Sequence, residues 1–406
     1  MSAPYIGLIG VLALFALLLL RLPVWAALAS LYTLSVVPLF ILTGGVAAAS
    51  GLSADLFKAA RVTLSDLRGG LAIATIGASV CFGAVCGSSI ATAATMAPIA
   101  LGEMRKAHYS DAFATGAVAA GGTLGILFPP SIILVIYGAI AQQSVPKLFA
   151  ASLVPGVLLT LLYIAVALLV ANRSPNAAPK GVSVPLRDRL AAVRGPWQFL
   201  TLFVVSIGGI YAGVFTPTEA ASVGAFGAIL LGLAGRQLRG KEIGKAIEAA
   251  VVTSCMLLLI IIGANIFAYF IVQTQLPALL VSEARILALP GPVVMLFVIL
   301  AYIIMGCFLD AIGMILITVP VFLPLITSYG YDPAWFAIIV VIVVELGLIH
   351  PPVGMNLFIV QVQAPDIKTM TIYRGVVPFL AAPFALIALL WLFPALVLWL
   401  PRFLYG

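Results

Sequence analysis

A short block that ends in two consecutive prolines occurs twice in this chain, each time within a long apolar stretch. The first copy, Gly-Ile-Leu-Phe-Pro-Pro, occupies residues 125–130, and the second, Gly-Leu-Ile-His-Pro-Pro, begins 222 residues later at residue 347. Proline lacks the backbone N–H and costs roughly 3 kcal/mol inside a helix, so two in succession end a helix. We therefore predict two discontinuous helices, with their breaks within residues 121–131 and 345–356.

The composition of the chain indicates the environment in which these breaks lie. Hydrophobic residues make up 64% of the 406 residues and charged residues only 8%, whereas ordinary soluble domains carry about 25% charged residues. A soluble globule of this size could not hide so much apolar surface, so the chain must lie in lipid. Opened backbone at membrane depth is tolerated only where it is buried in protein or lines a cavity. Both breaks are therefore candidate functional sites.

Charge and motif content exclude several classes of function. The net charge of +7 comes from Lys and Arg in short loops between apolar runs, which the positive-inside rule explains better than nucleic-acid binding does. The four cysteines lie in apolar runs and only two histidines are present, so we expect no transition-metal site. Residues 235–242 imitate a phosphate-binding loop, but Glu242 stands where a Ser or Thr would hold magnesium. We predict that the chain is not an enzyme and carries no cofactor.

The similarity between the two halves extends upstream of the double prolines. Gly83 and Thr95 in the first half match Gly306 and Thr318 in the second, at a spacing of 223 residues. Each copy has an apolar stretch interrupted by small or polar residues, then a polar loop, then the broken helix. We interpret the interrupted stretches as re-entrant helical hairpins at 69–102 and 292–328, with tips at 83–92 and 306–313.

Loop charges predict opposite orientations for the two copies. Lys58 and Arg105 flank the first hairpin, which places its ends on the cytoplasmic side, whereas the second hairpin has no positive cluster and its ends are expected outside. Such a pair is an inverted-topology repeat, common in secondary transporters. We predict an all-α polytopic membrane protein with inverted repeats, each with a re-entrant hairpin and a broken helix. The predicted domains are N-terminal scaffold helices (1–68), a first transport-domain repeat (69–147), central scaffold helices with cytoplasmic loops (148–291), a second transport-domain repeat (292–363) and a C-terminal scaffold helix (364–406).

Acidic residues inside the apolar segments are candidates for cation binding. Asp310 lies at the tip of the second hairpin, and Glu345 lies just before the second break. A charged group costs roughly 2.5–3.5 kcal/mol at this depth and is by default a functional candidate. Glu219, in Thr-Pro-Thr-Glu, fits a helix-capping role better. A carboxylate beside opened backbone suits a hard cation such as sodium, and a structural hydrogen bond is the alternative.

The tip of the first hairpin carries hydroxyls and no charge. Ser88, Ser89 and Thr92 follow Gly87 at a probable helix start. Helix N-termini have a positive partial charge and attract carboxylates, although small residues are also used simply for helix packing. With no Lys or Arg in the central parts of the four interrupted segments, an anionic substrate would be held by helix ends, hydroxyls and bound cations, which favours cation coupling.

Several ordered motifs resemble the large membrane subunit of TRAP transporters, the tripartite ATP-independent periplasmic transporters. The resemblance covers the chain from about residue 36 to the C-terminus. The motifs are Gly-Ser-Ser-Ile-Ala-Thr-Ala-Ala-Thr at 87–95, Gly-Gly-Thr-Leu-Gly at 121–125, Pro-Pro-Ser at 129–131, Thr-Pro-Thr-Glu-Ala-Ala at 216–221 and His-Pro-Pro-Val-Gly-Met-Asn at 350–356.

The resemblance implies a function and a set of partners. It implies sodium-driven uptake of an organic acid such as a C4-dicarboxylate or a sialic acid, by an elevator motion of the hairpin-containing domain. It implies a small four-helix membrane subunit and a periplasmic substrate-binding protein as partners, and a multi-pass location in the bacterial inner membrane. By the family pattern, both tips and both breaks form the binding sites. The substrate residues would be Gly87, Ser88, Ser89, Thr92, Ser131 and Asn356, and the sodium residues Ser88, Gly122, Thr123, Pro129, Gly306, Asp310, Thr318, Glu345 and Gly347.

Residues 23–36 depart from the family pattern, which usually has an additional span there. Arg21 and Lys58 both suggest the cytoplasmic side, but the apolar run between them has room for one comfortable span. Three other functions stay open from the sequence: a stand-alone cation-coupled carboxylate transporter, a passive anion channel and a membrane enzyme. The first would take up free substrate, the second would conduct without accumulation, and the third lacks convergent catalytic groups.

Overall fold

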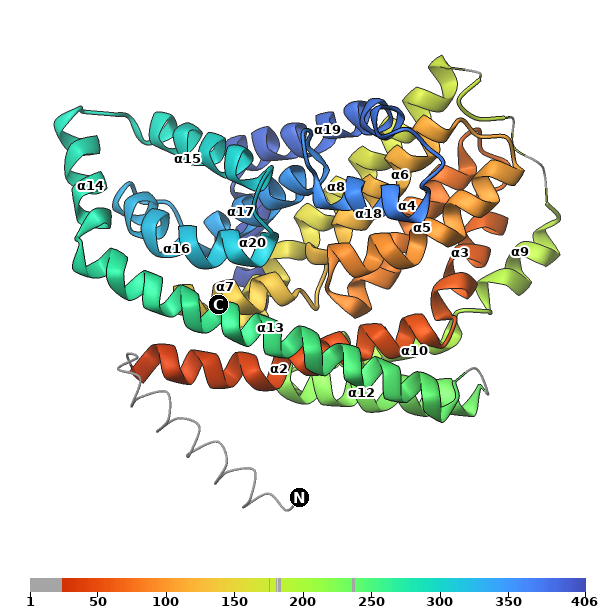
Figure 1. Cartoon of the computed structure of the whole chain (residues 1–406), viewed down its shortest axis with the longest axis horizontal. Coiled ribbons are helices and arrows are strands. Elements are labelled where there is room, and N and C mark those ends of the chain that lie inside the picture. The colour runs from red at the N-terminus through yellow and green to blue at the C-terminus, as the bar shows by residue number, and fades with distance from the viewer. Residues whose placement is uncertain (1–23, 175, 180, 182–183, 236–237) are drawn as a thin grey trace.

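A computed structural model describes residues 24–174, 176–179, 181, 184–235 and 238–406. Every regular element in these ranges is a helix (Figure 1). Five helices are long and apolar enough to cross a membrane, and two bent helix pairs could supply one span each. Many large apolar side chains on these helices are exposed, as expected where the surrounding solvent is lipid.

Both predicted hairpins and both broken helices are present, which confirms the predicted fold class. In each half, two helices form a hairpin, and the following helix stops at the double proline and resumes a few residues later. The first half consists of α4 (Gly70–Cys86), α5 (Ser89–Lys106), α6 (Asp111–Thr123), the 3-10 turn η1 (Leu124–Ile126) and α7 (Ile132–Ala141). The second consists of α15 (Gly291–Gly306), α16 (Ala311–Ser328), α17 (Pro333–Ile349) and α18 (Met355–Gln363).

The structural repeat is longer than the repeat that the sequence predicts. A long helix and a short helix precede each hairpin, and another long helix follows each broken helix, in the same order in both halves. These flanking helices carry no distinctive motif that recurs between the halves, so the alignment of residues could not reveal them. They are α2 (Val24–Ala49), α3 (Leu52–Thr63) and α8 (Val145–Arg173) in the first half, and α13 (Gly240–Gln273), α14 (Leu276–Ile286) and α19 (Thr369–Leu392) in the second.

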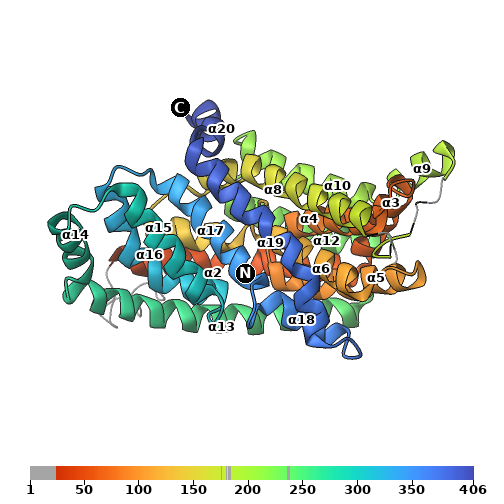
Figure 2. The ribbon, with the colours of Figure 1, turned by 90° about the horizontal axis from the view of Figure 1, so that it is seen from above.

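The two halves pack around each other with their long helices in contact. Figure 1 shows α2 and α13 side by side along one edge of the molecule, with α12 (Pro217–Ala234) beside them, and α3 and α14 at opposite ends. Helices α8 and α19 contact each other and the broken helices, and α20 (Ala395–Tyr405) packs on α8 (Figure 2). Thus α8 and α19, which we predicted as scaffold, directly border the predicted transport repeats; the domain boundaries themselves stay a prediction.

The segment between the halves has no counterpart in the repeat. It contains α9 (Leu186–Val193), α10 (Trp197–Phe203), the π-helical turn η2 (Val204–Gly208), α11 (Gly209–Tyr211) and α12. At the start of α12, Thr216 and Glu219 form a capping box, which confirms the capping role expected for Glu219. Helix α2 is continuous and is followed by a 64° bend into α3. Arg21, the other residue in the crossing argument, lies outside the described residues.

Glycine pairs let each hairpin approach its own broken helix. A Cβ atom on Gly83 would lie 2.4 Å from the Cα of Gly125, and a Cβ on Gly347 would lie 2.7 Å from the Cα of Gly306. Real Cβ atoms do not come so close to a neighbouring backbone, so only glycine fits at these crossings. The repeat alignment matches Gly83 with Gly306 and Gly125 with Gly347, so the two crossings are equivalent contacts that the duplicated glycines preserve.

Candidate functional site

The two hairpin tips and the first helix break meet at one small pocket of about 80 Å³. It therefore brings together segments that lie more than 200 residues apart in the sequence. Its polar groups are two serines and one aspartate, and most of its wall is branched aliphatic. The lining residues are Gly87, Ser88, Ser89, Ile90, Ile126, Ile132, Ile133, Asp310, Ala311, Ile312 and Leu348.

The first tip is held against the first break by a glycine. Gly87 has φ +63°, in the left-handed region, and a Cβ there would lie 2.2 Å from the carbonyl oxygen of Pro130. Only glycine accommodates both conditions. The next residue, Ser88, caps α5, because its hydroxyl oxygen accepts a hydrogen bond from the backbone N–H of Ala91 at 3.3 Å. The tip thus presents the N-terminus of α5 to the pocket.

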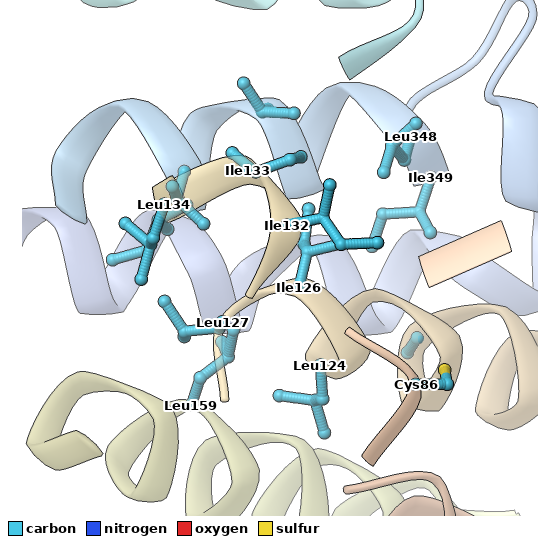
Figure 3. Packing of buried hydrophobic residues seen from close by; sticks show 14 of the residues in the cluster. Cys86, Leu124, Ile126, Leu127, Ile132, Ile133, Leu134, Leu159, Leu348 and Ile349 are labelled. Atoms are coloured by element: carbon cyan, nitrogen blue, oxygen red, sulfur yellow. The ribbon is translucent and has the colours of Figure 1, made fainter. Parts of the chain in front are cut away.

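The first break ends in a second serine cap. The hydroxyl oxygen of Ser131 accepts a hydrogen bond from the backbone N–H of Leu134 at 3.2 Å, at the start of α7. Ser131 is buried, and the pocket is lined by the two residues that follow it, Ile132 and Ile133. Figure 3 shows Ile132 and Ile126 beside Leu348 of α17, so aliphatic side chains from both repeats enclose this end of the break.

The second tip has a charged cap. One carboxylate oxygen of Asp310 accepts hydrogen bonds from the backbone N–H groups of Ile312 at 3.1 Å and Gly313 at 3.0 Å. The carboxylate therefore offsets the positive partial charge at the start of α16. Its second oxygen is free of these bonds and can accept a further donor or a cation.

Three helix N-termini converge on the pocket, and they differ in charge. The first residues of α5, α7 and α16 all line it. Neutral serines cap α5 and α7, so their positive ends stay available to an anion. The carboxylate that caps α16 makes the opposite wall attractive to a cation. The pocket thus has one side suited to an anion and one side suited to a cation, without any Lys or Arg in its lining.

Asn356, which belongs to the second repeat, contacts Ser89 on the side of the pocket suited to an anion. It is fully buried near the start of α18, and its amide nitrogen donates a hydrogen bond to the hydroxyl of Ser89 at 2.7 Å. Its amide oxygen has no hydrogen-bond partner among the described residues. The bond joins the second broken helix to the first hairpin, but Asn356 does not itself line the pocket.

Glu345 lies in a second polar cluster inside the protein. It is fully buried in α17, and neither carboxylate oxygen has a hydrogen-bond partner among the described residues. Tyr163 of α8 lies within electrostatic reach of it, and the hydroxyl of Tyr163 is 3.2 Å from that of Thr123. Glu345 and Thr123 are 222 residues apart, so they are equivalent positions of the two repeats. A buried carboxyl group without a partner is either protonated or compensated by a cation.

The other predicted residues lie near the crossings rather than in the pocket wall. Thr92 is buried behind the first tip and donates to the carbonyl oxygen of Ser88 at 2.8 Å. Thr318 donates to the hydroxyl of Tyr302 at 2.6 Å. Gly122 lies against α5, where a Cβ would be 2.8 Å from that of Ala93. Pro129 is buried in the break, and Gly306 and Gly347 form the glycine crossing. The assignment of Thr92 to the substrate and of the other residues to sodium stays a prediction.

Two kinds of residue near the site were not predicted from the sequence. The aliphatic wall of the pocket, such as Ile126 and Leu348, is indistinguishable in sequence from any other apolar helix residue. Tyr163 and Tyr302 form hydrogen bonds with Thr123 and Thr318, one in each repeat. They could have been suspected, because a buried tyrosine hydroxyl in a membrane helix needs a hydrogen-bond partner.

The chain is similar to known transport proteins over nearly its whole length. The family model for "Tripartite ATP-independent periplasmic transporter, DctM component" matches residues 5–396. The chain is 38% identical to the C4-dicarboxylate TRAP transporter large permease protein DctM of Pseudomonas aeruginosa, covering 92% of this chain and 87% of that protein. It is 31% identical to the sialic acid TRAP transporter large permease protein SiaM of Vibrio cholerae, with the same coverage. The solved YdaH transporter of Alcanivorax borkumensis shares the fold, with a TM-score of 0.61 at 17% identity over 91% of this chain and 85% of that one.

Proposed function

Because this chain belongs to the DctM component family of tripartite ATP-independent periplasmic transporters, we propose that it imports a small organic acid together with sodium ions. The family predicted from the motifs is thereby confirmed, and the chain is a multi-pass transporter subunit rather than an enzyme. The observation that carries the proposal is the pocket at which three helix N-termini meet, two with neutral caps and one with Asp310 as its cap.

The neutral side of the pocket is the proposed carboxylate site. The N-termini of α5 and α7 offer backbone N–H groups and positive partial charge, and Ser88 and Ser89 offer hydroxyls. Two of the relatives carry names that specify a C4-dicarboxylate and a sialic acid, so we propose an acid of one of these classes as the substrate. The burial of Asn356 behind Ser89 fixes the orientation of that serine and so supports recognition.

The charged side of the pocket and the Glu345 cluster are the proposed sodium sites. Sodium would offset the charge of Asp310 next to the substrate, and a second ion would offset the charge of the buried Glu345. Each ion would make entry of an anion into a low-dielectric site less costly. Binding of cation and anion would thus be mutually favourable, which is what coupling of their transport requires.

The proposed transport cycle involves a movement of part of the chain and two partner subunits. The hairpins and broken helices would move across the membrane as one body, in an elevator motion, against a scaffold that includes the α2, α12 and α13 helices. As one component of a tripartite transporter, the chain acts with other subunits. We propose that these are a small four-helix membrane subunit and a periplasmic binding protein that delivers the acid, and that the complex lies in the bacterial inner membrane.

The test is uptake by the chain reconstituted with its small subunit in liposomes. Labelled succinate and sialic acid would be supplied with and without an inward sodium gradient, and with and without the cognate binding protein. We expect accumulation of one acid only when both sodium and the binding protein are present. Glu345→Gln, which keeps the size of the side chain, should raise the sodium concentration needed for half-maximal uptake.

Other outcomes would contradict the proposal in distinct ways. Sodium-driven uptake of free acid would identify a stand-alone cation-coupled transporter. Equilibration without accumulation would identify a passive anion channel. An unchanged sodium dependence in Glu345→Gln would remove the second sodium site while leaving the pocket at Asp310 in place.

A further inference from the structure

Helix α9 has an apolar face that no other part of the described chain covers. Leu186, Leu190 and Val193 follow an i, i+4, i+7 spacing, which places them on one side of the helix, and their exposed fractions are 70, 60 and 49%. Apolar groups this exposed are not expected on a helix that faces water alone. Together they define the α9 stripe.

The α9 stripe continues into a membrane span. Helix α9 leads directly into the segment Trp197–Tyr211, which is bent from it by 46° and forms with it a candidate span. Exposed apolar residues also appear on that segment, at Trp197 and Leu200. Tryptophan is enriched where membrane helices enter the headgroup layer. The bend and the tryptophan therefore place α9 at the membrane surface.

The charges of α9 are arranged around the stripe. Arg187 and Arg194 are exposed and seven residues apart, so they share one side of the helix, next to the stripe. Three arginines and one aspartate lie within residues 186–194. An apolar face bordered by arginines is typical of helices that lie in the boundary between lipid headgroups and acyl chains.

The remaining side of α9 is fixed to the first repeat. Arg189 forms an ion pair with Asp66 in the loop that precedes the first hairpin, and it donates a hydrogen bond to the carbonyl oxygen of Val184 at 3.0 Å. Helix α9 also packs on α3. This contact borders the stripe, since Arg189 and Val193 are four residues apart, and the stripe itself stays exposed, at the end of the molecule where α3 lies (Figure 1).

We propose that α9 lies in the cytoplasmic leaflet and is held there by anionic phospholipids. The stripe enters the acyl region, and Arg187 and Arg194 contact the lipid phosphates. The cytoplasmic leaflet is the negatively charged one, and the basic loops on both sides of α9 place this end of the molecule there. Through Arg189 and Asp66, the lipid-bound helix anchors the loop from which the first hairpin begins.

Spin labels at two positions of α9 test the proposal. In a background with Cys255→Ala, Leu190→Cys places a label on the stripe and Asp188→Cys places one on the opposite side of the same helix. The complete complex would be placed in nanodiscs of phosphatidylcholine, with or without phosphatidylglycerol. Collision with lipid-soluble oxygen and with a water-soluble nickel chelate then reports the depth of each label.

We expect the oxygen-to-nickel ratio at 190 to exceed that at 188 severalfold, and to rise when phosphatidylglycerol is added. Arg187→Gln with Arg194→Gln should abolish that rise and leave the label at 190 shallower. Equal ratios at 188 and 190 would overturn the proposed membrane contact. A deep label at 190 that is indifferent to both phosphatidylglycerol and the arginines would overturn the role of anionic lipid and indicate that another protein surface covers the stripe.

Discussion

The two hairpins have the same architecture but differ in burial and in charge. In α4, 13 of 17 residues are buried, whereas in α15 only 6 of 16 are. The first tip is capped by a neutral serine and the second by an aspartate. The large apolar side chains of Phe297 and Phe308 in the second hairpin are exposed, at 60 and 71%.

This difference shows that the two copies kept the same backbone arrangement after duplication, whereas many of their side chains diverged. The positions that must stay glycine are shared, because they set how closely each hairpin approaches its broken helix. The positions that carry charge diverged, so one repeat supplies the side of the pocket suited to an anion and the other the side suited to a cation. The less buried second hairpin also has fewer contacts to lose if it moves.

The largest expected effect concerns the charged cap. Asp310→Asn should lower sodium-stimulated uptake about a hundredfold, about 3 kcal/mol, because the cation-binding side of the pocket loses its charge. Asp332→Asn is the matched control, since Asp332 also caps a helix by accepting hydrogen bonds from two backbone N–H groups, at the start of α17 and away from the pocket. Initial rates over a series of sodium concentrations measure both. An equal loss in the two variants would show that Asp310 matters only as a cap.

The next largest expected effect is a loss of stability when a glycine at one of the two crossings is replaced. A Cβ on Gly83 would lie 2.4 Å from backbone and one on Gly306 would lie 3.1 Å from it, so the first crossing is the tighter one. Gly83→Ala should destabilise the protein by about 1–3 kcal/mol, and Gly306→Ala by less. Thermal unfolding in detergent, followed by tryptophan fluorescence, measures the difference. Equal shifts in the two variants would mean that the crossings are equally tolerant.

A smaller effect is expected for the hydrogen bond between the repeats. Asn356→Ala leaves the buried Ser89 hydroxyl without this partner and should cost about 1–2 kcal/mol. A double-mutant cycle with Ser89→Ala should give a coupling of about 1 kcal/mol. The equivalent residues of the other repeat, Ile312 and Leu134, have no polar side chains, so no second bond can compensate. Additive losses would show that the two side chains act independently.

The smallest effect compares the two tyrosine–threonine pairs. Tyr163→Phe and Tyr302→Phe should each cost about 0.5–1.5 kcal/mol in the free energy of unfolding. The cost stays small because Thr123 and Thr318 keep their bonds to the carbonyl oxygens of Ala120 and Met314. The same thermal unfolding measurement applies. A clearly larger loss for one tyrosine would show that the pairs are not equivalent.

The sequence predicts the hairpins and the broken helices well, because a helix break or a hairpin tip requires residue types that are unusual in a membrane helix. Double prolines, tip glycines and an aspartate such as Asp310 are all rare inside apolar runs, so they located both breaks and both tips. The alignment found only the central part of the repeat, because helices such as α2 and α13 are kept by general apolarity rather than by particular residues.

The site was predictable only in part, for a related reason. Ser88, Ser89 and Asp310 stand out by their chemistry, and the structure brings them to one pocket. Their arrangement depends on which helix ends converge, and that is set by packing between segments far apart in the chain. The aliphatic lining, the Asn356–Ser89 bond and the pairing of Tyr163 with Thr123 all arise from that packing, which no local pattern reports.

The extended repeat, from α2 to α8 and from α13 to α19, also bears on ancestry. A duplicated unit that is functional in two opposite orientations implies an ancestral half-length chain able to insert into the membrane either way round. Such a chain would carry little charge bias between its loops. The basic residues around the first hairpin, such as Lys58 and Arg105, and the lack of a positive cluster around the second, which has only Arg285 before it, then record how each copy became fixed in one orientation after fusion.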